Sequence, residues 1–369
     1  MRILIAAGGT GGHVYPALAI AEAIENVQPG TKLAFVGSVG GFERPLIAES
    51  GVQFERQSEV YAGPLHGVSP LRIVFSLLQI VIGTLQALGL ILSWRPQALL
   101  LTGGWVGLPV ALAAWLLRVP GMIYLPDIEP GLAIKVLRRL VRRVAITAPE
   151  SARYFPAGQT VVTCYPLRRD VMDASRDAAQ THFALDPARK TLLVFGGSRG
   201  ARTINTALLD ALPALAARSD LQIIHVTGTL DWDTIDSRRK TLGHLPHYHA
   251  FPYLHHDMGL AFAAADLVVS RSGASILGEF PFFGLPAILV PYPYAWRYQK
   301  VNADFLAEHG AAIVMNDADM GRDLLCTIET LLDDPSRLAQ MQTQAKALSQ
   351  PDGARRAAAA LMRLATGEG

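Results

Sequence analysis

The sequence predicts an α/β fold in two doubly wound halves, each built around a parallel sheet. Short apolar runs alternate with helix-length segments at the start of the chain, at residues 3–7, 15–24 and 32–36. The same alternation begins again at residues 190–195 (KTLLVF), with a further strand-like run at 222–226. Strands that alternate with helices are typical of βαβ units and hence of parallel sheets. A length of 369 residues also favours two domains over one.

The composition excludes several classes of protein. Hydrophobic residues make up 50% of the chain and charged residues 17%, which is too apolar for a disordered chain. The formal net charge of +2 gives no overall basic field, so we expect no nucleic-acid partner. Cys164 and Cys326 lack the spacing of a zinc site or a disulfide framework, which fits a reducing cytoplasm. The N-terminal residues predict a first strand and not a signal peptide.

Two glycine-rich loops follow predicted strands and precede predicted helices. GGTGGH occupies residues 8–13, and GGSRGA occupies residues 196–201. Glycines let the backbone approach a ligand, and a helix N-terminus offers N–H groups and positive potential, so each loop predicts an anion site. A plain tight turn is the alternative for the first loop. Neither loop has a Walker motif or the spacing of a dinucleotide fingerprint, which disfavours magnesium-dependent phosphoryl transfer and NAD binding.

Residues 73–93 carry no charge and pass the length test for a transmembrane helix. Polar or small side chains nevertheless recur along one helical face, at Arg72, Ser76, Gln79, Gly83 and Gln86. This periodicity favours a helix that packs on a domain and turns its apolar face to lipid. A membrane span is the alternative.

Residues 135–144 predict a basic amphipathic helix. The basic side chains share one face of it, namely Lys135, Arg138, Arg139, Arg142 and Arg143. Such a helix is typical of a membrane surface, and a solvated face on an ordinary core helix is the alternative. Anionic lipid attracts each lysine or arginine near its surface by roughly 1 kcal/mol. Together with residues 73–93, this segment predicts peripheral contact with an anionic membrane.

Several longer motifs follow one another along almost the whole chain. They are GGTGGHVYPALAIAEAI, FVGSVGGFERPLIAESGV, TGGWVGLPVALAAWLLRVP, YPLRRDV, GGSRGARTIN, PYLHHDMGLAFAAADLVVSRSGAS and YQKVNA. In this combination the chain resembles the MurG family. The resemblance implies an inverting glycosyltransferase that moves N-acetylglucosamine from UDP-GlcNAc to the 4-hydroxyl of undecaprenyl-pyrophosphoryl-MurNAc-pentapeptide, from lipid I to lipid II, in peptidoglycan synthesis. It also implies a GT-B fold, in which two doubly wound Rossmann-like domains face a cleft.

The resemblance divides the chain and places it in the cell. Residues 1–167 become the acceptor-binding and membrane-associating domain, and residues 168–346 the UDP-sugar-binding domain. A C-terminal helix within residues 347–369 returns to the first domain, and the polar stretch 168–188 is interpreted as a linker. We expect a peripheral protein on the cytoplasmic face of the cell membrane, with anionic lipid and cell-wall synthesis proteins as partners. We expect no metal and no cofactor, since UDP-GlcNAc is a substrate.

The family's site residues carry over to matching positions of this sequence. The resemblance gives a catalytic role to His13, as the base near the acceptor hydroxyl, and Asp127 is a second catalytic candidate, at a position where the sequence departs from the family. The resemblance places UDP-GlcNAc binding at Thr10, Gly11, Gly12, His13, Arg168, Gly197, Ser198, Leu254, Arg271, Ser272, Gly273, Glu279 and Gln299, and acceptor binding at Gly104, Trp105 and Asp127.

Asp127 departs from the family's pattern, because residues 124–127 (YLPD) replace the family's HEQN. Its carboxylate could orient His13, replace an amide or act as the base, and the alternative is an N-cap after Pro126. His13 could likewise serve helix capping, and Arg168 a hinge ion pair. The rival enzyme is a UDP-sugar transferase that acts on diacylglycerol or another polyprenyl-linked acceptor. The rival outside enzymes is a nucleotide-sugar-binding protein without turnover.

Overall fold

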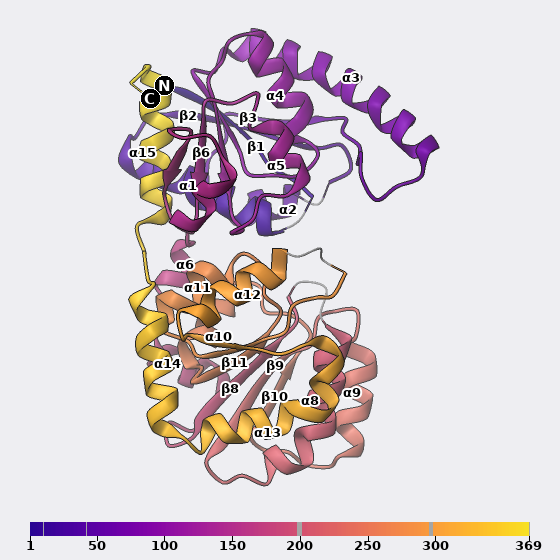
Figure 1. Cartoon of the computed structure of the whole chain (residues 1–369), viewed down its shortest axis with the longest axis vertical. Helices are drawn as coiled ribbons and strands as arrows, with labels where there is room; N and C mark the ends of the chain where they lie inside the picture. The colour runs from indigo at the N-terminus through magenta and orange to yellow at the C-terminus, as the bar shows by residue number, and fades with distance from the viewer. Residues whose placement is uncertain (10, 42, 198–200, 295–297, 369) are drawn as a thin grey trace. The chain divides into compact units, whose positions relative to one another are not determined.

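The chain forms two compact units in a computed structural model that describes residues 1–9, 11–41, 43–197, 201–294 and 298–368 (Figure 1). Unit 1 holds residues 1–168 and 351–369, and unit 2 holds residues 169–350. The chain therefore leaves unit 1 once and returns to it for its last helix.

Unit 1 is a parallel sheet of seven strands covered by helices. Its strands are β1 Arg2–Ala6, β2 Lys32–Ser38, β3 Arg56–Val60, β4 Ala98–Leu101, β5 Gly121–Leu125, β6 Arg143–Ile146 and β7 Thr160–Val162, in the order β3-β2-β1-β4-β5-β6-β7. Its helices are α1 Gly11–Val27, α2 Glu43–Glu49, α3 Pro70–Trp94, α4 Gly107–Leu116, α5 Leu132–Leu137, the 3-10 helix η1 Pro149–Tyr154, and α15 Gly353–Thr366. The strand order reverses between β1 and β4, and ligands of doubly wound sheets bind at such a switch point.

Unit 2 repeats this architecture with six parallel strands. They are β8 Lys190–Phe195, β9 Leu221–Val226, β10 Tyr248–Phe251, β11 Leu267–Ser270, β12 Ala287–Leu289 and β13 Ala312–Val314, in the order β10-β9-β8-β11-β12-β13. The helices are α6 Arg169–Met172, α7 Arg176–Phe183, α8 Arg202–Ala216, α9 Trp232–Thr241, α10 Met258–Ala264, α11 Ile276–Phe283, α12 Tyr298–Glu308, the 3-10 helix η2 Asp317–Asp319, α13 Met320–Leu332 and α14 Pro335–Ala347. Its switch point lies between β8 and β11.

The last helix, α15, packs against α1 of unit 1 (Figure 1). Alanines and leucines fill its buried face, at Ala357, Ala358, Leu361 and Leu364. Small side chains bring the two helices close together, and at Gly353 a Cβ atom would collide with the carbonyl oxygen of Tyr165. The alanine-rich composition of this segment is therefore explained by its contact with α1.

Helix α3 turns the middle of its polar stripe to the protein, at the buried Ser76 and Gly83 and the half-buried Gln79, and its apolar face outward. The Oε1 atom of Gln86 accepts a hydrogen bond from Tyr61 N at 3.0 Å, and a Cβ atom on Gly83 would collide with the Tyr61 carbonyl oxygen. The outward face carries exposed large apolar side chains, at Leu71, Val74, Phe75, Leu77, Leu78, Val81, Ile82, Leu85 and Leu92. Within the described part of the chain, α3 is the one helix long and apolar enough to cross a membrane by length and composition.

The expected basic helix over residues 135–144 is wrong. Helix α5 ends at Leu137, and strand β6 begins at Arg143. Val144 pairs with Ile123 of β5 and with Thr160 of β7, so sheet pairing overrides the helical periodicity of the sequence. Lys135, Arg139 and Arg142 are nevertheless exposed, and Arg138 is half-buried, so the positive charge stays at the surface.

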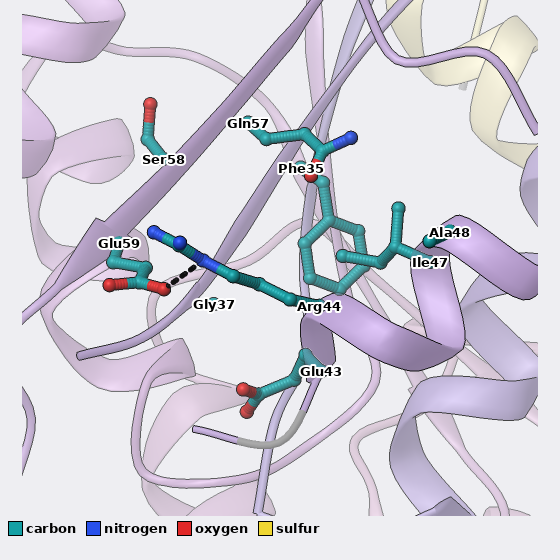
Figure 2. Close-up of a pocket in the computed structure, with 9 residues that line it drawn as sticks. All are labelled: Phe35, Gly37, Glu43, Arg44, Ile47, Ala48, Gln57, Ser58 and Glu59. Atoms are coloured by element: carbon teal, nitrogen blue, oxygen red, sulfur yellow. Dashed lines mark ion pairs between the residues drawn. The ribbon is translucent and has the colours of Figure 1, made fainter. Parts of the chain in front are cut away.

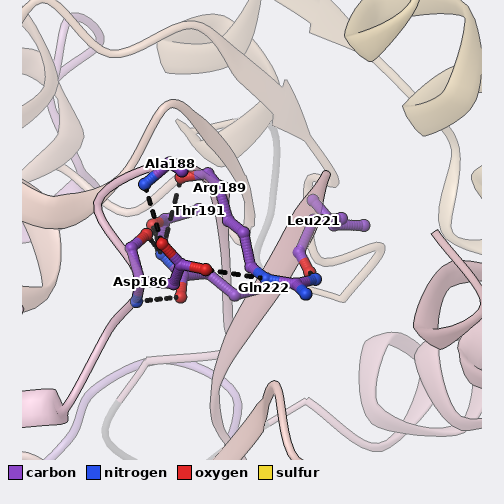
Figure 3. A network of polar contacts seen from close by, with 6 residues as sticks. All are labelled: Asp186, Ala188, Arg189, Thr191, Leu221 and Gln222. Atoms are coloured by element: carbon purple, nitrogen blue, oxygen red, sulfur yellow. Dashed lines mark hydrogen bonds and ion pairs between the residues drawn. The ribbon is translucent and has the colours of Figure 1, made fainter. Parts of the chain in front are cut away.

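The stretch 168–188 is not a plain linker, because it contains α6 and α7. Its end is fixed to the start of the second sheet by a polar network around Gln222 (Figure 3). The buried Gln222 amide accepts from Asp186 N at 2.9 Å and donates to the Asp186 carbonyl and to Thr191 Oγ1, each at 3.0 Å. Asp186 also accepts from Ala188 N at 2.9 Å and from Arg189 Nε at 3.3 Å. These bonds fix where β8 begins.

Candidate active site

The GGTGGH loop and the TGGW motif meet at the switch point of unit 1. Gly8 and Gly9 follow β1, and Gly103 and Gly104 follow β4, which is the neighbour of β1 in the sheet. Gly104 has a φ of +79°, and a Cβ atom there would collide with the carbonyl oxygen of Gly8. Only glycine satisfies both conditions, because other residues rarely adopt that backbone conformation and would not fit. The first loop and the TGGW motif therefore form one surface.

His13 lies on the first turn of α1, and its ring lies between Gly8 of the GGTGGH loop and Gly103 of the TGGW motif. Its Nδ1 atom lies 3.1 Å from the Gly8 carbonyl oxygen, and its own carbonyl accepts from Thr102 Oγ1 at 2.7 Å. A Cβ atom on Gly103 would lie 2.5 Å from Cδ2 of the imidazole ring. The absence of side chains at these glycines is what leaves space for the ring. His13 therefore packs between the ends of β1 and β4.

The surroundings of His13 also set its protonation. Burial lowers the pKa of His13 below its usual value of 6.5, and the hydrogen bond with the Gly8 carbonyl opposes this only in part. A carbonyl can only accept, so the neutral ring carries its proton on Nδ1 and a lone pair on Nε2. Near neutral pH, Nε2 is thus the basic atom of this side chain.

Glu43 is a buried acid that the sequence analysis missed. Its side chain is 3% exposed, and Oε1 accepts a hydrogen bond from Gly9 N at 3.4 Å. Cβ atoms on Gly8 or Gly41 would collide with its carboxylate, so the glycines of two loops close around it. A first-turn glutamate normally reads as a solvated helix residue, and only the glycines on both sides of it in space reveal its burial.

Glu43 also lines a cavity of about 470 Å³ beside the first glycine loop (Figure 2). Arg44 reaches from α2 to Glu59 on β3, with 2.6 Å between Nε and Oε1. The other lining residues are Phe35, Gly37, Ile47, Ala48, Gln57 and Ser58. The cavity is therefore mixed in character, with an aromatic and aliphatic wall and several polar groups.

Asp127 follows β5 and does not cap a helix. Helix α5 begins only at Leu132, with Gly131 as its N-cap, so the N-cap alternative for Asp127 is wrong. Burial and the nearby Tyr165 raise the pKa of Tyr124 well above 10, and the negative charge of Asp127 raises it further. The half-buried Asp127 carboxylate thus lies close enough to Tyr124 for an electrostatic interaction, at the carboxyl edge of the sheet. Trp105, also half-buried, follows Gly104 at the end of β4.

Four other expected donor-site residues belong to unit 1. Gly11 and Gly12 form the start of α1, where Gly11 packs near the ring of Tyr15. The guanidinium of Arg168 lies 4.5 Å from the centre of that ring, which is a cation–π contact. Thr10, between the glycines, lies outside the described residues.

Four loops converge on the carboxyl edge of the sheet in unit 2. Gly197 follows β8 with a φ of +88°, and Arg271 follows the adjacent strand β11. Tyr292 follows β12, and Asp317 follows β13. The adjacent Ser272 is fully buried, and Gly273 has open space where a Cβ would stand. Ser198, which the family resemblance assigns to a phosphate, lies outside the described residues.

Arg271 is buried in a set of contacts that the sequence did not reveal. Its side chain is 9% exposed, and Nη1 donates to the Val290 carbonyl at 3.2 Å. Asp317 Oδ1 lies 2.5 Å from Nη1, and the guanidinium lies 5.3 Å from the centre of the Tyr292 ring. The guanidinium of Arg271 therefore forms an ion pair with Asp317, a hydrogen bond with the Val290 carbonyl and a cation–π contact with Tyr292. Its ion pair with Asp317 is therefore largely buried and is not a surface salt bridge.

Gln299 joins this group through the backbone of Tyr292. Its Oε1 atom accepts a hydrogen bond from Tyr292 N at 2.8 Å, so the amide oxygen is used within the protein. Glu279, on the first turn of α11, and Leu254, after β10, complete the expected positions in unit 2. Within the described residues, no group of three or more His, Cys, Asp or Glu side chains is arranged to hold a metal ion.

Comparisons with known proteins agree with this architecture over both units. The family model of the glycosyltransferase family 28 N-terminal domain matches residues 3–146, and that of the C-terminal domain matches residues 191–357. The crystal structure of Acinetobacter baumannii MurG has a TM-score of 0.75 and 26% identity, covering 98% of this chain and 99% of that chain. A putative UDP-N-acetylglucosamine 2-epimerase from Listeria monocytogenes has a TM-score of 0.74 at 13% identity and shares the fold. The predicted α/β GT-B class is confirmed.

Named relatives match along nearly the whole chain. A protein of Desulforudis audaxviator is 38% identical over 361 residues, which cover 95% of each chain. A protein of Roseiflexus sp. is 40% identical over 420 residues, covering 97% of this chain and 94% of its own. Both carry the name UDP-N-acetylglucosamine--N-acetylmuramyl-(pentapeptide) pyrophosphoryl-undecaprenol N-acetylglucosamine transferase. With two family 28 domains and relatives of this identity and coverage, the chain belongs to the MurG family of glycosyltransferases.

Proposed function

We propose that the protein transfers N-acetylglucosamine from UDP-GlcNAc to the 4-hydroxyl of undecaprenyl-pyrophosphoryl-MurNAc-pentapeptide, with inversion at the anomeric carbon. Membership of the family supports the substrates. The observation that carries the chemistry is the placement of His13, whose Nδ1 is engaged by the Gly8 carbonyl at 3.1 Å. In this tautomer the lone pair of the ring is on Nε2, which we propose accepts the proton at the switch point of unit 1.

In this proposal His13 is the general base. As the acceptor oxygen attacks C1 of the sugar, its proton passes to Nε2, and the bond from C1 to the UDP oxygen breaks with its electron pair leaving on UDP. A lowered pKa keeps the imidazole neutral at neutral pH, which is the form that can accept a proton. We propose that Asp127, which follows β5, and Gly104 and Trp105, which follow the adjacent strand β4, contact the acceptor.

Unit 2 holds the donor in this proposal. The glycine loop after β8 leads into α8, whose N-terminal end offers N–H groups and positive potential to a diphosphate. Arg271 supplies further N–H donors, and Glu279 can accept hydrogen bonds from ribose hydroxyl groups. Protein donors then balance the charge that grows on UDP as the glycosidic bond breaks, which predicts activity in the presence of EDTA.

We further propose that unit 1 lies on the cytoplasmic membrane surface by the outward face of α3. Leu78 and Leu85 on that face are 56% and 64% exposed, an unusual display of apolar surface for a soluble domain. Exposed Lys135, Arg139 and Arg142 would attract anionic lipid. A peripheral position also suits an acceptor with a polyprenyl tail.

One reaction tests the proposal. Purified protein is incubated with UDP-GlcNAc and synthetic lipid I, and lipid II and UDP are measured. Formation of both, and their loss in His13→Ala, supports the proposal. Because residues 124–127 depart from the family's pattern, a parallel reaction contains diacylglycerol in place of lipid I. Sugar transfer to diacylglycerol alone would assign the rival activity, and UDP-GlcNAc binding without any transfer would assign a binding protein.

A further inference from the structure

We infer that Asp317 is a positioning residue of the donor site, which joins Arg271 to the first turn of α8 and balances the arginine's charge. The inference rests on the proposed function, since it takes Arg271 and α8 to be the groups that meet the diphosphate. Asp317 lies outside the motifs that carry the family resemblance.

The two carboxylate oxygens of Asp317 have different partners. Oδ1 lies 2.5 Å from Nη1 of Arg271, and Oδ2 accepts a hydrogen bond from Thr203 Oγ1 at 3.1 Å. The side chains of Asp317 and Arg271 are 19% and 9% exposed, so water screens their ion pair only weakly. A single carboxylate thus connects two segments that the chain separates by nearly seventy residues.

The sheet order explains how this contact arises. Thr203 is in α8, which follows β8 and the glycine loop, whereas Arg271 follows β11 and Asp317 follows the edge strand β13. All these strands are parallel, so the segments that follow them gather at one edge of the sheet. Asp231 holds the same helix from the other direction, because Arg202 Nε and Asn205 Nδ2 donate to its two oxygens at 3.1 and 3.2 Å. The first turn of α8 is therefore anchored on two sides.

Charge balance is the second consequence of this contact. Paired with Asp317, Arg271 presents directed N–H donors to a ligand but little net positive charge. A diphosphate would then be oriented without being held so tightly that UDP leaves slowly. Loss of the Asp317 charge should leave a buried, uncompensated guanidinium beside the diphosphate and so tighten UDP binding.

The test measures UDP binding to the full-length protein by calorimetry, at low and at high salt. Asp317→Asn keeps the size of the side chain and removes its charge, so we expect a dissociation constant for UDP roughly three- to tenfold lower and more sensitive to salt. Asp323→Asn is the matched control, because Asp323 pairs with the exposed Arg322 on α13 and lies outside the site. The control should bind UDP as the unchanged protein does. Equal affinities in the two variants, or weaker binding in Asp317→Asn, would overturn the inference.

Thr203 supplies a second, independent measurement. Thr203→Val removes the hydrogen bond to Asp317 Oδ2 and keeps the shape of the side chain, so Arg271 and α8 lose their common anchor. We expect kcat to fall roughly three- to tenfold, with the KM for UDP-GlcNAc changed less than twofold. Thr203→Ser keeps the hydroxyl group and should retain the kcat of the unchanged protein. Full activity in Thr203→Val would also overturn the inference. Absence of UDP binding and of transfer in the unchanged protein would instead defeat the proposed function.

Discussion

The Nδ1 atom of His13 lies 3.1 Å from the carbonyl oxygen of Gly8, so the backbone of the glycine loop selects the tautomer of the side chain that follows it. The loop therefore does more than approach a ligand. It also determines which nitrogen of the imidazole is basic, through a hydrogen bond within one short segment of chain.

We predict that the acid limb of the pH profile of kcat/KM lies below pH 6.5. The reaction needs neutral His13, burial lowers the pKa of this group from 6.5, and activity should therefore persist to lower pH than an ordinary histidine allows. His13→Ala should remove this limb and lower kcat by roughly two to four orders of magnitude, with the affinity for UDP unchanged. Steady-state kinetics between pH 4.5 and 8, with calorimetry for UDP, measures both. A limb that His13→Ala leaves in place would belong to another group.

We predict that Glu43→Gln lowers kcat on lipid I by roughly tenfold and spares UDP binding. The carboxylate accepts from Gly9 N and is enclosed by Gly8 and Gly41, so an amide would turn an N–H group toward backbone that has no room for it. Displacement of Gly8 would also move the carbonyl that orients His13. Glu49→Gln, at the exposed end of the same helix, is the control and should retain full activity.

We predict that acid destabilises unit 2 through His225. This side chain is buried, bonded to Tyr248 OH at 2.7 Å and to Asn205 Oδ1 at 2.9 Å, and burial lowers the pKa of His225 from 6.5 to about 3. Between these values the unfolded chain binds a proton that the folded chain does not. Stability therefore rises with pH through this window, by up to about 1.4 kcal/mol per pH unit, and falls as pH drops.

Urea unfolding at pH 7.5 and at pH 5 measures this effect of His225. His225→Gln should lower stability at pH 7.5, because it breaks the network, and should flatten the dependence on pH. His244→Gln, in an exposed loop, should leave the slope as it is. The same slope in His225→Gln and in the unchanged protein would assign the acid sensitivity to other groups.

We predict that the outward face of α3 and the exposed basic side chains of residues 135–142 control membrane binding separately. Leu78→Glu with Leu85→Glu should abolish binding to vesicles at any salt concentration, since both exposed side chains would carry charge into the lipid. Neutral substitutions at Lys135, Arg139 and Arg142 should weaken binding to anionic vesicles and reduce its dependence on salt. Vesicle sedimentation measures both sets. Turnover of a soluble, short-chain acceptor should survive in each, and extraction only by detergent would favour a spanning α3.

The fold class follows from local signals, but some elements and site contacts do not. Periodicity correctly predicts the outward face of α3, because one helix face needs only local sequence to define it. The same reasoning fails at residues 135–144, where Val144 is drawn into β6 by strands from distant parts of the chain. The motifs give roles to His13 and Arg271, whereas Glu43 lies in a motif without an assigned role and Asp317 lies outside the motifs. Strand order brings Glu43, which follows β2, to the segment after β1, and brings Asp317, which follows β13, to the segment after β11.

The packing of α3 on α4 fixes the distance between these two helices of unit 1. Helix α4 begins at Gly107, just past Trp105 and the glycines that close over His13. Packed helices lie about 8–10 Å apart between their axes, so a protein that rests on a bilayer by α3 would hold the start of α4 about one helix diameter from α3. The distance from lipid to imidazole would then be set by helix packing, without any motion of the acceptor away from its membrane.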